Sequence, residues 1–340
     1  MGMPILGHVP PAGQFPWFAR IMGVKSCGYQ PVRQLERVTT MEYCVFIQAN
    51  EKQYLGAVIA EYALRRNSKH NDKFDIRVMN YDDFPCLKAR EGDYYLRDGG
   101  KRQWVRDDLQ SFTPTRFLPP QLMNYQGRAV VIDPDVFAVA DIWDLLSRDM
   151  QGKAILCRPK SGSKGRRGCL ATSVMLLDNA KLTHWKFEQQ FNAMFDFERD
   201  YMKWVCLKYE DPDTIGFFES EWNDFDHLTE KTKMLHTTKR KHQPWKTGLP
   251  VDFRAADTFR LFPPKHWVRR ARRALFGDYG FAGKYKQHPD PNQVNFFFGL
   301  LKECLEKGIL TETQLREEMA RNHIRHDAFE VLERTPPLAA

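Results

Sequence analysis

Three short runs of mostly apolar residues constrain what this chain can fold into. They cover residues 43–49, 129–132 and 172–177 of a 340-residue sequence. Runs of this length are typical of strands that are buried on both faces of a sheet. After the first run, apolar residues fall on one face of a helix, and residues 74–79 form another strand-like run. This strand–helix–strand order predicts an α/β, doubly wound sheet that begins with parallel strands.

Polar side chains follow two of these runs directly. Asn50 comes after the first run, and Asp133 and Asp135 follow the second, separated by Pro134. Such sheets bind ligands outside the carboxyl ends of their strands. In extended backbone, which Pro134 favours at Asp133, both carboxylates point to the same side. The segment therefore suits a divalent cation such as Mg²⁺ or Mn²⁺, with an Asp-Pro-Asp turn as the alternative interpretation.

A basic, histidine-bearing segment lies far downstream of these carboxylates. It runs from His236 through Lys239, Arg240 and Lys241 to Trp245. A neutral imidazole is a frequent metal ligand, and the cations suit the phosphates of a nucleotide. The alternative is a hydrogen-bonded histidine in a solvated basic loop.

Composition limits the class of protein without choosing a function. A net charge of +8 and 42% hydrophobic residues describe a globular protein that favours phosphate-rich partners. Seven widely spaced cysteines without a CxxC pair predict reduced thiols rather than a zinc ribbon. The sequence shows no signal peptide and no apolar run long enough to span a bilayer. We therefore expect a soluble, cytoplasmic protein.

The character of the sequence changes along the chain and predicts three parts. Residues 1–40 are rich in Pro and Gly and lack a clear period, which predicts an irregular arm. Residues 41–250 hold the apolar runs and both ligand-bearing segments, so we expect the catalytic domain there. Residues 251–340 are helical in pattern and predict a C-terminal extension.

Within the extension, residues 267–275 predict a strongly basic helix. Residues 292–333 predict two further helices, and Thr311 begins a capping box for the second. The arginines from Arg269 to Arg273 could bring the protein to an anionic membrane surface. An ordinary solvated helix flank is the alternative.

Several segments, taken in order, resemble glycosyltransferase family eight, the glycogenin-like enzymes with a GT-A fold. Asp133-Pro-Asp135 resembles the family's Asp-x-Asp motif, and residues 236–245 resemble its His-x-x-Gly-x-x-Lys-Pro-Trp loop. Residues 171–177 are similar to its Asn-x-Gly-Val-Met-Leu strand, and Trp222-Asn223 matches the Trp-Asn before the loop. The resemblance covers about residues 43–250, and the ordered set is more specific than any one motif.

The resemblance implies a role for individual residues. The implied ligands of Mn²⁺ or Mg²⁺ are Asp133, Asp135 and His236. The implied binders of the nucleotide base are Phe46, Gln48 and Asn50. Arg116 stands where an arginine of the family reaches the donor, and Asp200 stands where an acidic residue faces the sugar.

The basic loop departs from the family pattern. It is one residue longer, Lys239 occupies the position of the glycine, and Gln243 occupies the position of the phosphate-binding lysine. That lysine's role could fall to Lys241, Lys239 or Lys246, and we rank Lys241 first. Ala171 replaces the asparagine that contacts the sugar, so the resemblance does not indicate which sugar is carried.

The implied activity is a hexosyltransferase-like transfer of a sugar from a nucleotide-diphosphate donor, with a UDP-sugar expected, to an acceptor hydroxyl with retention. A basic nucleic-acid-binding protein is one rival, favoured by the net charge and by the basic residues at 158–168 and 269–273. The lack of a nucleic-acid-binding motif disfavours it. A catalytically inactive protein with a transferase fold is the other rival.

Overall fold

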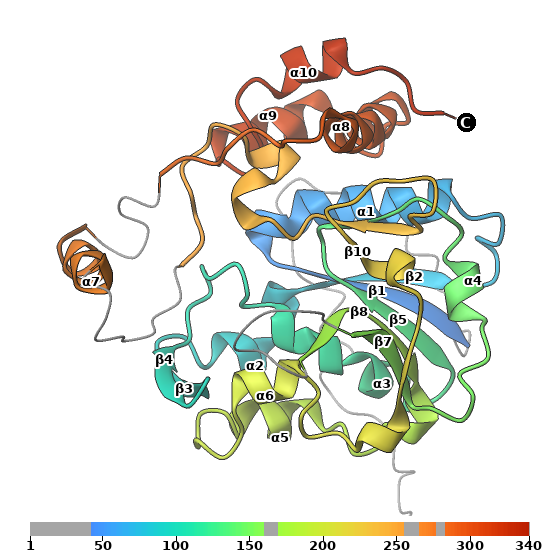
Figure 1. Ribbon diagram of the computed structural model, residues 1–340, viewed down its shortest axis with the longest axis vertical. Helices are drawn as coiled ribbons and strands as arrows, with labels where there is room; N and C mark the ends of the chain where they lie inside the picture. The colour runs from blue at the N-terminus through green and yellow to red at the C-terminus, as the bar shows by residue number, and fades with distance from the viewer. Residues whose placement is uncertain (1–41, 160–168, 255–264, 277–282, 340) are drawn as a thin grey trace, which may run out of the picture. The chain divides into compact units, whose positions relative to one another are not determined.

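The computed structural model describes residues 42–159, 169–254, 265–276 and 283–339 (Figure 1). At its centre lies a six-stranded sheet with the order β2-β1-β5-β8-β7-β9. The strands are β1 (Tyr43–Ala49), β2 (Asp75–Asn80), β5 (Arg128–Ile132), β7 (Ile155–Pro159), β8 (Leu170–Asp178) and β9 (Ile215–Phe217). The expected irregular arm at residues 1–40 and most of the basic loop at 158–168 lie outside the described residues.

The sheet is mixed, which confirms the expected α/β class. β1 pairs in parallel with both β2 and β5, as the strand–helix–strand pattern predicts. β8 runs antiparallel to β5 and to β7, and β9 runs parallel to β7. All three predicted apolar runs form strands, and the side chains of Phe46, Val131 and Met175 are fully buried in them.

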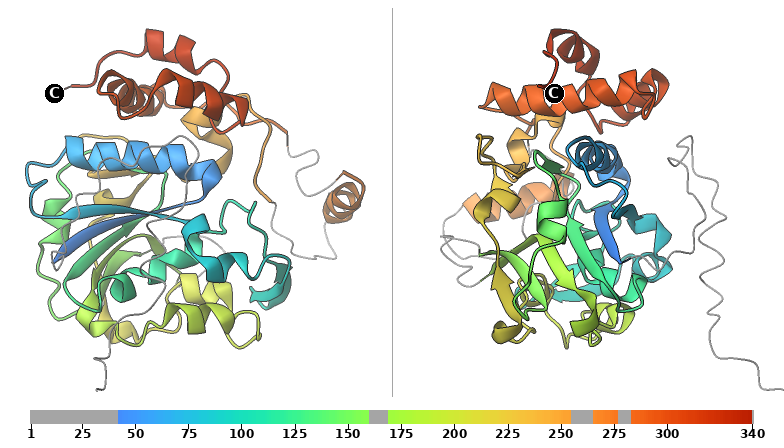
Figure 2. Two further views of the ribbon diagram at one scale, coloured as in Figure 1. Left: turned by 180° about the vertical axis from the view of Figure 1, so that it is seen from behind. Right: turned by 90° about the vertical axis from the view of Figure 1, so that its right-hand side faces the viewer.

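Helices cover both faces of this sheet. α1 (Tyr54–Arg66) lies on one face, and α3 (Pro119–Leu122), α5 (Phe187–Asn192) and α6 (Tyr201–Val205) lie on the other (Figures 1 and 2). The buried face of α1 carries Leu55, Ile59 and Tyr62, as its spacing predicts, whereas Val58 is only half-buried. The remaining short helices here are α2 (Pro85–Lys88) and α4 (Trp143–Leu146).

Two smaller sheets flank the central one. β10 (Asp224–Phe225), β11 (Met234–His236) and β6 (Val136–Ala138) form a three-stranded sheet with β11 in the middle. β3 (Tyr94–Arg97) and β4 (Gly100–Gln103) form an antiparallel hairpin. Both small sheets contribute residues to the pocket described below.

The C-terminal part is helical, as expected, but its segmentation differs from the prediction. α7 (Lys265–Phe276) confirms the basic helix, and its contact with a membrane stays a prediction. Residues 292–333 form three helices rather than two, namely α8 (Pro291–Glu306), α9 (Glu312–Ala320) and α10 (Ala328–Arg334). The expected capping box at Thr311 is present. Asn322 adopts a φ of +60°, a conformation that ends a helix, so α9 and α10 are separate.

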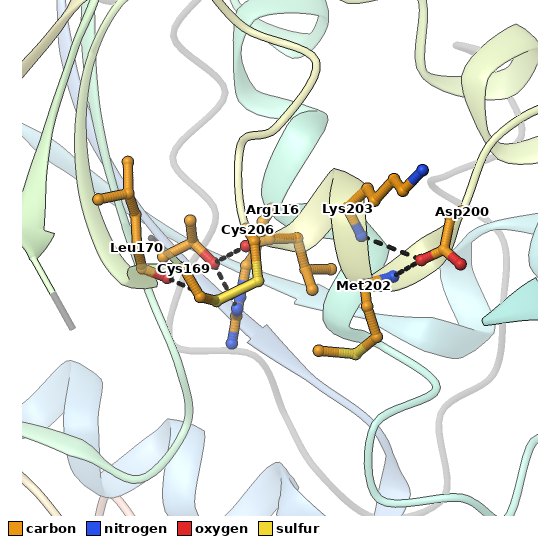
Figure 3. Close-up of a disulfide and its surroundings, with 9 residues drawn as sticks. Arg116, Cys169, Leu170, Asp200, Met202, Lys203 and Cys206 are labelled. Carbon is orange, nitrogen blue, oxygen red and sulfur yellow. Dashed lines mark hydrogen bonds between the residues drawn. A yellow bond between two sulfur atoms is a disulfide. The ribbon is translucent and has the colours of Figure 1, made fainter. Parts of the chain in front are cut away.

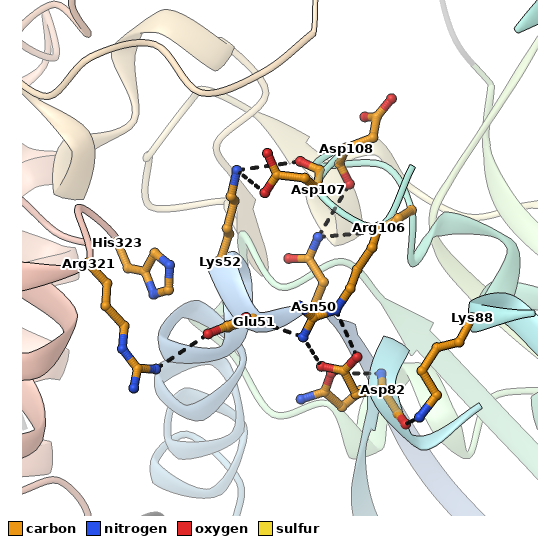
Figure 4. Close-up of polar contacts among 12 residues, drawn as sticks. Asn50, Glu51, Lys52, Asp82, Lys88, Arg106, Asp107, Asp108, Arg321 and His323 are labelled. Atoms are coloured by element: carbon orange, nitrogen blue, oxygen red, sulfur yellow. Dashed lines mark hydrogen bonds and ion pairs between the residues drawn. The ribbon is translucent and has the colours of Figure 1, made fainter. Parts of the chain in front are cut away.

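Polar contacts join α8 and α9 to the sheet domain. Glu303 in α8 accepts hydrogen bonds from the Tyr62 hydroxyl at 2.5 Å and from Arg66 Nε at 2.8 Å. Arg321, which follows α9, reaches Glu51 at 3.5 Å (Figure 4).

The domain boundaries expected near residues 41, 250 and 340 stay predictions. None of the helices in the described ranges combines the length and the apolar character that a membrane span requires.

Gly56 lets α1 approach the Asp-Pro-Asp segment closely. A Cβ atom added at Gly56 would lie 2.6 Å from the carbonyl oxygen of Pro134. That oxygen belongs to the backbone and cannot rotate aside. The position of Pro134, between the two carboxylates, therefore depends on a helix residue without a side chain.

We predict that Gly56→Ala destabilises the protein, although alanine is the better helix former by about 1 kcal/mol. The added methyl group would force α1 away from Pro134, and overpacking of this kind costs about 1–3 kcal/mol. The free energy of unfolding, measured by urea titration, should fall accordingly.

Gly299→Ala in α8 is the matched control. It makes the same exchange inside a helix, but the nearest obstacle, at 2.6 Å, is the side chain of Leu338, which can turn away. We expect a smaller loss there. A loss at Gly56 equal to or below that at Gly299 would contradict the importance of the Pro134 contact.

Candidate active site

A pocket of about 530 Å³ opens beyond the carboxyl ends of β1 and β5. Asp133, Asp135 and His236 line it together with Arg116, as the sequence predicts. Arg240, one of the cations of the basic segment, also lines it, as does Arg97, which the sequence did not single out. The pocket therefore combines two carboxylates, an imidazole and several guanidinium groups.

Strand pairing brings the histidine to the carboxylates. β11 runs antiparallel to β6, and His236 stands opposite Val136, the residue after Asp135. The backbone N–H and the hydroxyl of Thr237 both donate to the Asp135 carbonyl at 3.1 Å and hold this register. As a result, one ligand atom from each of Asp133, Asp135 and His236 lies within 4.8 Å of the others.

A buried hydrogen-bond chain orients the His236 ring. Asn223 donates through Nδ2 to the Ser173 hydroxyl at 3.0 Å, and its Oδ1 lies 2.8 Å from His236 Nδ1. An accepting Oδ1 requires a proton on Nδ1, and in a neutral ring the lone pair is then on Nε2. Nε2 lies 3.4 Å from Asp135 Oδ1, on the pocket side. Neighbours that fix the tautomer in this way are usual behind metal-binding histidines.

Asp133 is held by its neighbours, in contrast to Asp135. Arg116 forms a bidentate ion pair with the Asp133 carboxylate, and Gln48 donates to it through Nε2. Arg116 Nη1 also donates to the Thr172 hydroxyl at 2.8 Å. Burial raises the pKa of the Asp133 carboxyl, an effect that the Arg116 guanidinium opposes. Asp133 is thus a half-buried ligand that its neighbours hold in place, whereas the ion-pair partner of the Asp135 carboxylate among the described residues is His236.

The donor set fits a divalent cation. Two carboxylates provide the hard oxygen ligands that Mg²⁺ and Mn²⁺ prefer, and an imidazole nitrogen with a free lone pair is accepted by Mn²⁺ and other transition metals. The cluster lies at the pocket wall, so positions would remain for oxygens of a bound phosphate. These residues could hold a metal ion.

The residues expected at the nucleotide base lie behind the pocket wall. Phe46 and Gln48 are fully buried in β1, and Gln48 is engaged with Asp133. Asn50 donates to the Asp108 carbonyl at 3.4 Å and to the Ser111 hydroxyl at 3.3 Å (Figure 4). Gln53, three residues further on, does line the pocket. A base-binding role for this segment stays a prediction.

Asp200 acts as a helix cap in the described structure. Its Oδ1 accepts from the N–H groups of Met202 and Lys203 at 2.7 and 3.1 Å (Figure 3). Its Oδ2 accepts from Gly99 N–H at 2.8 Å, in the turn between β3 and β4. Asp200 does not line the pocket, whereas its neighbours Tyr201 and Met202 do. Its predicted contact with a sugar is untested.

The three lysines considered for phosphate binding differ from one another. Lys246 is fully buried, and its ammonium donates to Asp252 at 3.1 Å and to the Asn322 carbonyl at 3.0 Å. Burial lowers the pKa of Lys246, and the Asp252 carboxylate opposes that shift. Lys239 and Lys241 are exposed and do not line the pocket. Lys246 therefore has a structural role here, and we do not propose it as a phosphate-binding residue.

Arg240 and Gln243 line the pocket where the lysines do not. Gln243 is buried, and its Oε1 has no hydrogen-bond partner among the described residues. Arg240 is exposed, like Lys239 and Lys241, and lies at the start of a 3₁₀ turn, Arg240–His242. Because a single turn decides which of these consecutive cations lines the pocket, the sequence offered no signal to choose Arg240.

No protein-family model and no curated protein matches this sequence. Solved structures show a remote likeness. The glycosyltransferase GlyE of Streptococcus pneumoniae TIGR4 matches at 14% identity and a TM-score of 0.44, over 79% of this chain and 64% of that chain. Mouse xyloside xylosyltransferase 1 matches at 12% identity and a TM-score of 0.39, over 58% of this chain and 98% of that chain. The galactosyltransferase LgtC matches at 11% identity and a TM-score of 0.42, over 61% of this chain and 91% of that chain. Likeness at this level carries no argument about activity.

A disulfide forms part of the pocket wall. Cys169, before β8, is bonded to Cys206, at the end of α6, and both residues line the pocket (Figure 3). The expectation that all cysteines are reduced thiols is therefore wrong for this pair. The residues are 37 positions apart, so spacing gave no signal of the pairing. The cytoplasmic location stays a prediction, and this bond weighs against it because disulfides are rare in the cytosol.

We predict that reduction of this disulfide destabilises the protein. Closing a loop of 37 residues stabilises a fold by about 3–4 kcal/mol in the chain-entropy description. The melting temperature of the wild type should therefore fall by several degrees in reductant. Cys206→Ser should melt at that lower temperature with and without reductant.

Cys86→Ser is the control, since Cys86 is half-buried and unpaired in the described structure. It should keep the response of the wild type to reductant. Equal melting temperatures of oxidised and reduced wild type would contradict a stabilising disulfide.

Proposed function

We propose that this chain is a metal-dependent glycosyltransferase that moves a sugar from a nucleotide-diphosphate donor, expected to be a UDP-sugar, to an acceptor hydroxyl. The observation that carries the proposal is the convergence of Asp133, Asp135 and His236 at a pocket that arginines also line. A metal site next to the Arg240 guanidinium suits a diphosphate, because both neutralise phosphate charge.

The diphosphate of the donor would lie between the metal ligands and Arg240. Asp133, Asp135 and His236 would hold a divalent ion, Mn²⁺ or Mg²⁺, which when bound supplies Lewis-acid stabilisation of the charge on a leaving diphosphate. Arg240 would donate to the phosphate oxygens from the other side of the pocket. Gln243, whose Oε1 has no hydrogen-bond partner in the part of the chain that the structure describes, offers a further polar contact to the donor.

The fixed charges are arranged before any ligand arrives. Arg116 and Gln48 hold Asp133, and Asn223 holds the ring of His236. Groups that are already oriented need no reorganisation while charge develops, and electrostatic stabilisation of this kind is usually the largest contribution to catalysis. The metal-binding side of the pocket would therefore be the rigid part of the site. Arg240, which lies in a short turn, would be the side chain that adjusts to the donor.

Retention of the anomeric configuration is part of the proposal and rests on the family resemblance. Retention by a covalent intermediate needs a carboxylate beside the anomeric carbon. Asp200 accepts three backbone N–H groups and faces away from the pocket lining. We therefore favour a route in which the leaving phosphate assists the incoming hydroxyl on the same face of the sugar.

We predict that Mn²⁺ and UDP together raise the melting temperature of the wild type. A ligand at a hundred times its Kd stabilises the folded state by about 2.7 kcal/mol, which corresponds to a shift of about 4 °C for a chain of this length. Asp135→Ala should remove the joint effect, because it deletes one of the three metal ligands and leaves the backbone carbonyl that Thr237 contacts. EDTA should reverse the effect in the wild type.

Asp178→Ala is the matched control. Asp178 ends β8 opposite Arg128, the first residue of β5, and so lies at the other end of the strands from the pocket. It pairs with Lys181 at 3.0 Å, and its loss should leave the joint effect intact. If the wild type shows no Mn²⁺-dependent UDP binding, the enzyme proposal fails. Release of UDP from a panel of UDP-sugars would separate an active enzyme from an inactive protein with the same fold.

We also predict that Arg240, rather than Lys241, contributes the cation that contacts the phosphates. Loss of a charge-assisted hydrogen bond should weaken UDP binding in Arg240→Ala by about tenfold or more. Lys241→Ala and Lys239→Ala remove equal charge from the same loop and should weaken it much less. Calorimetric titration with UDP in Mn²⁺ measures all three, and a larger loss in Lys241→Ala would reverse the assignment.

A further inference from the structure

The pocket carries more positive charge than the proposed donor needs. Arg116 is paired with Asp133, and Asp135 lies beside the metal position. A divalent ion and the diphosphate of a donor have opposite charges and nearly compensate each other. Arg97 and Arg240 remain, and when a diphosphate contacts Arg240, Arg97 keeps only a share of the Asp108 carboxylate, which is paired with Arg102.

Arg97 has only neutral partners within the described residues. It ends β3, where Nη1 donates to the Tyr95 hydroxyl at 3.2 Å and Nη2 donates to Gln110 Oε1 at 2.7 Å. The guanidinium lies 4.3 Å from the centre of the Tyr201 ring. A guanidinium has five N–H donors, so these contacts fix its plane without using all of them.

The surrounding charges do not balance Arg97. The neighbouring carboxylate of Asp108 is paired with Arg102 at 2.6 Å. Partial desolvation is the main cause that lowers the pKa of Arg240, and repulsion from Arg97 lowers it further. Two cations that repel each other across a pocket favour an anion between them.

The fold holds Arg97 in this position. Asp200 accepts the Gly99 N–H and so ties the β3–β4 turn to the start of α6, which carries Tyr201. Tyr201 and Gln110 line the pocket beside Arg97. The guanidinium is therefore oriented before a ligand binds, which reduces the entropy that binding would cost.

We propose that Arg97 is the centre of a second anion subsite, which binds a carboxylate carried by one of the sugar substrates. This inference rests on the proposed function and extends it to the substrate class. A carboxylate fits because the planar fork of a single, fixed guanidinium matches its two oxygens. The carboxylate could belong to a uronic acid on the donor or to an acidic sugar on the acceptor.

The experiment compares ligands that differ only in the carboxylate. Binding of UDP-glucuronate and UDP-glucose is measured by calorimetry in Mn²⁺, with UDP as the reference. A second arm measures methyl glucuronide against methyl glucoside, with and without UDP and Mn²⁺. We expect a preference of about tenfold or more for the uronate in one arm, as a charge-assisted hydrogen bond provides, and that arm identifies the substrate.

Arg97→Gln should abolish this preference and leave the affinity for UDP itself unchanged. Arg97→Lys keeps the charge but loses the fork, and should retain only part of the preference. Lys101→Gln is the control. It removes a cation from the same hairpin at an exposed position, where Lys101 lies over Phe197 at 4.5 Å and outside the pocket. It should keep the full preference.

Two results would overturn the subsite. One is the absence of a uronate preference in both arms. The other is a preference that persists in Arg97→Gln, which would leave Arg97 as a stacking partner of Tyr201 only. Wild type that binds UDP with Mn²⁺ but shows no preference loses the subsite and keeps the proposed function. A failure of Mn²⁺-dependent UDP binding defeats the proposed function itself.

Discussion

The pairing of β6 with β11 is the constraint on which the candidate site depends. It places His236 opposite the residue that follows Asp135, although the two segments are about a hundred residues apart in the chain. Each strand has only three residues, so other contacts must secure the register. Thr237 supplies two hydrogen bonds to the Asp135 carbonyl, and Phe137 packs edge-to-face on Trp245 at 5.9 Å.

The two aspartates of the site have different tasks because their surroundings differ. Asp133 is enclosed by Arg116 and Gln48, so its negative charge is compensated within the protein. The carboxylate of Asp135 has no guanidinium ion pair like that of Asp133 among the described residues, and it lies 3.4 Å from His236 Nε2, so its charge is available to a cation. One carboxylate is therefore held in place by its neighbours before a ligand arrives. The other can bind a cation from solution.

The cations of the 239–246 segment divide between structure and site in a way that their sequence does not reveal. Lys246 stabilises the fold, since its buried ammonium satisfies Asp252 and the Asn322 carbonyl. Trp245 stacks on Phe297 of α8 at 4.7 Å and anchors the segment. Arg240 lines the pocket between two exposed lysines. Positive charge near a phosphate can be supplied from more than one backbone position, so the position of Gln243 need not carry it.

Local patterns of the sequence determined the elements and the ligand types. The apolar runs at 43–49, 129–132 and 172–177 form strands, and the capping box at Thr311 is present. These features are local, because strand burial and capping depend on neighbouring residues.

The tertiary structure alone decided the antiparallel direction of β8, the Cys169–Cys206 bond, the capping role of Asp200 and the choice of Arg240 and Arg97 as pocket cations. Each depends on contacts between residues far apart in the chain, about which a single sequence carries no periodic signal.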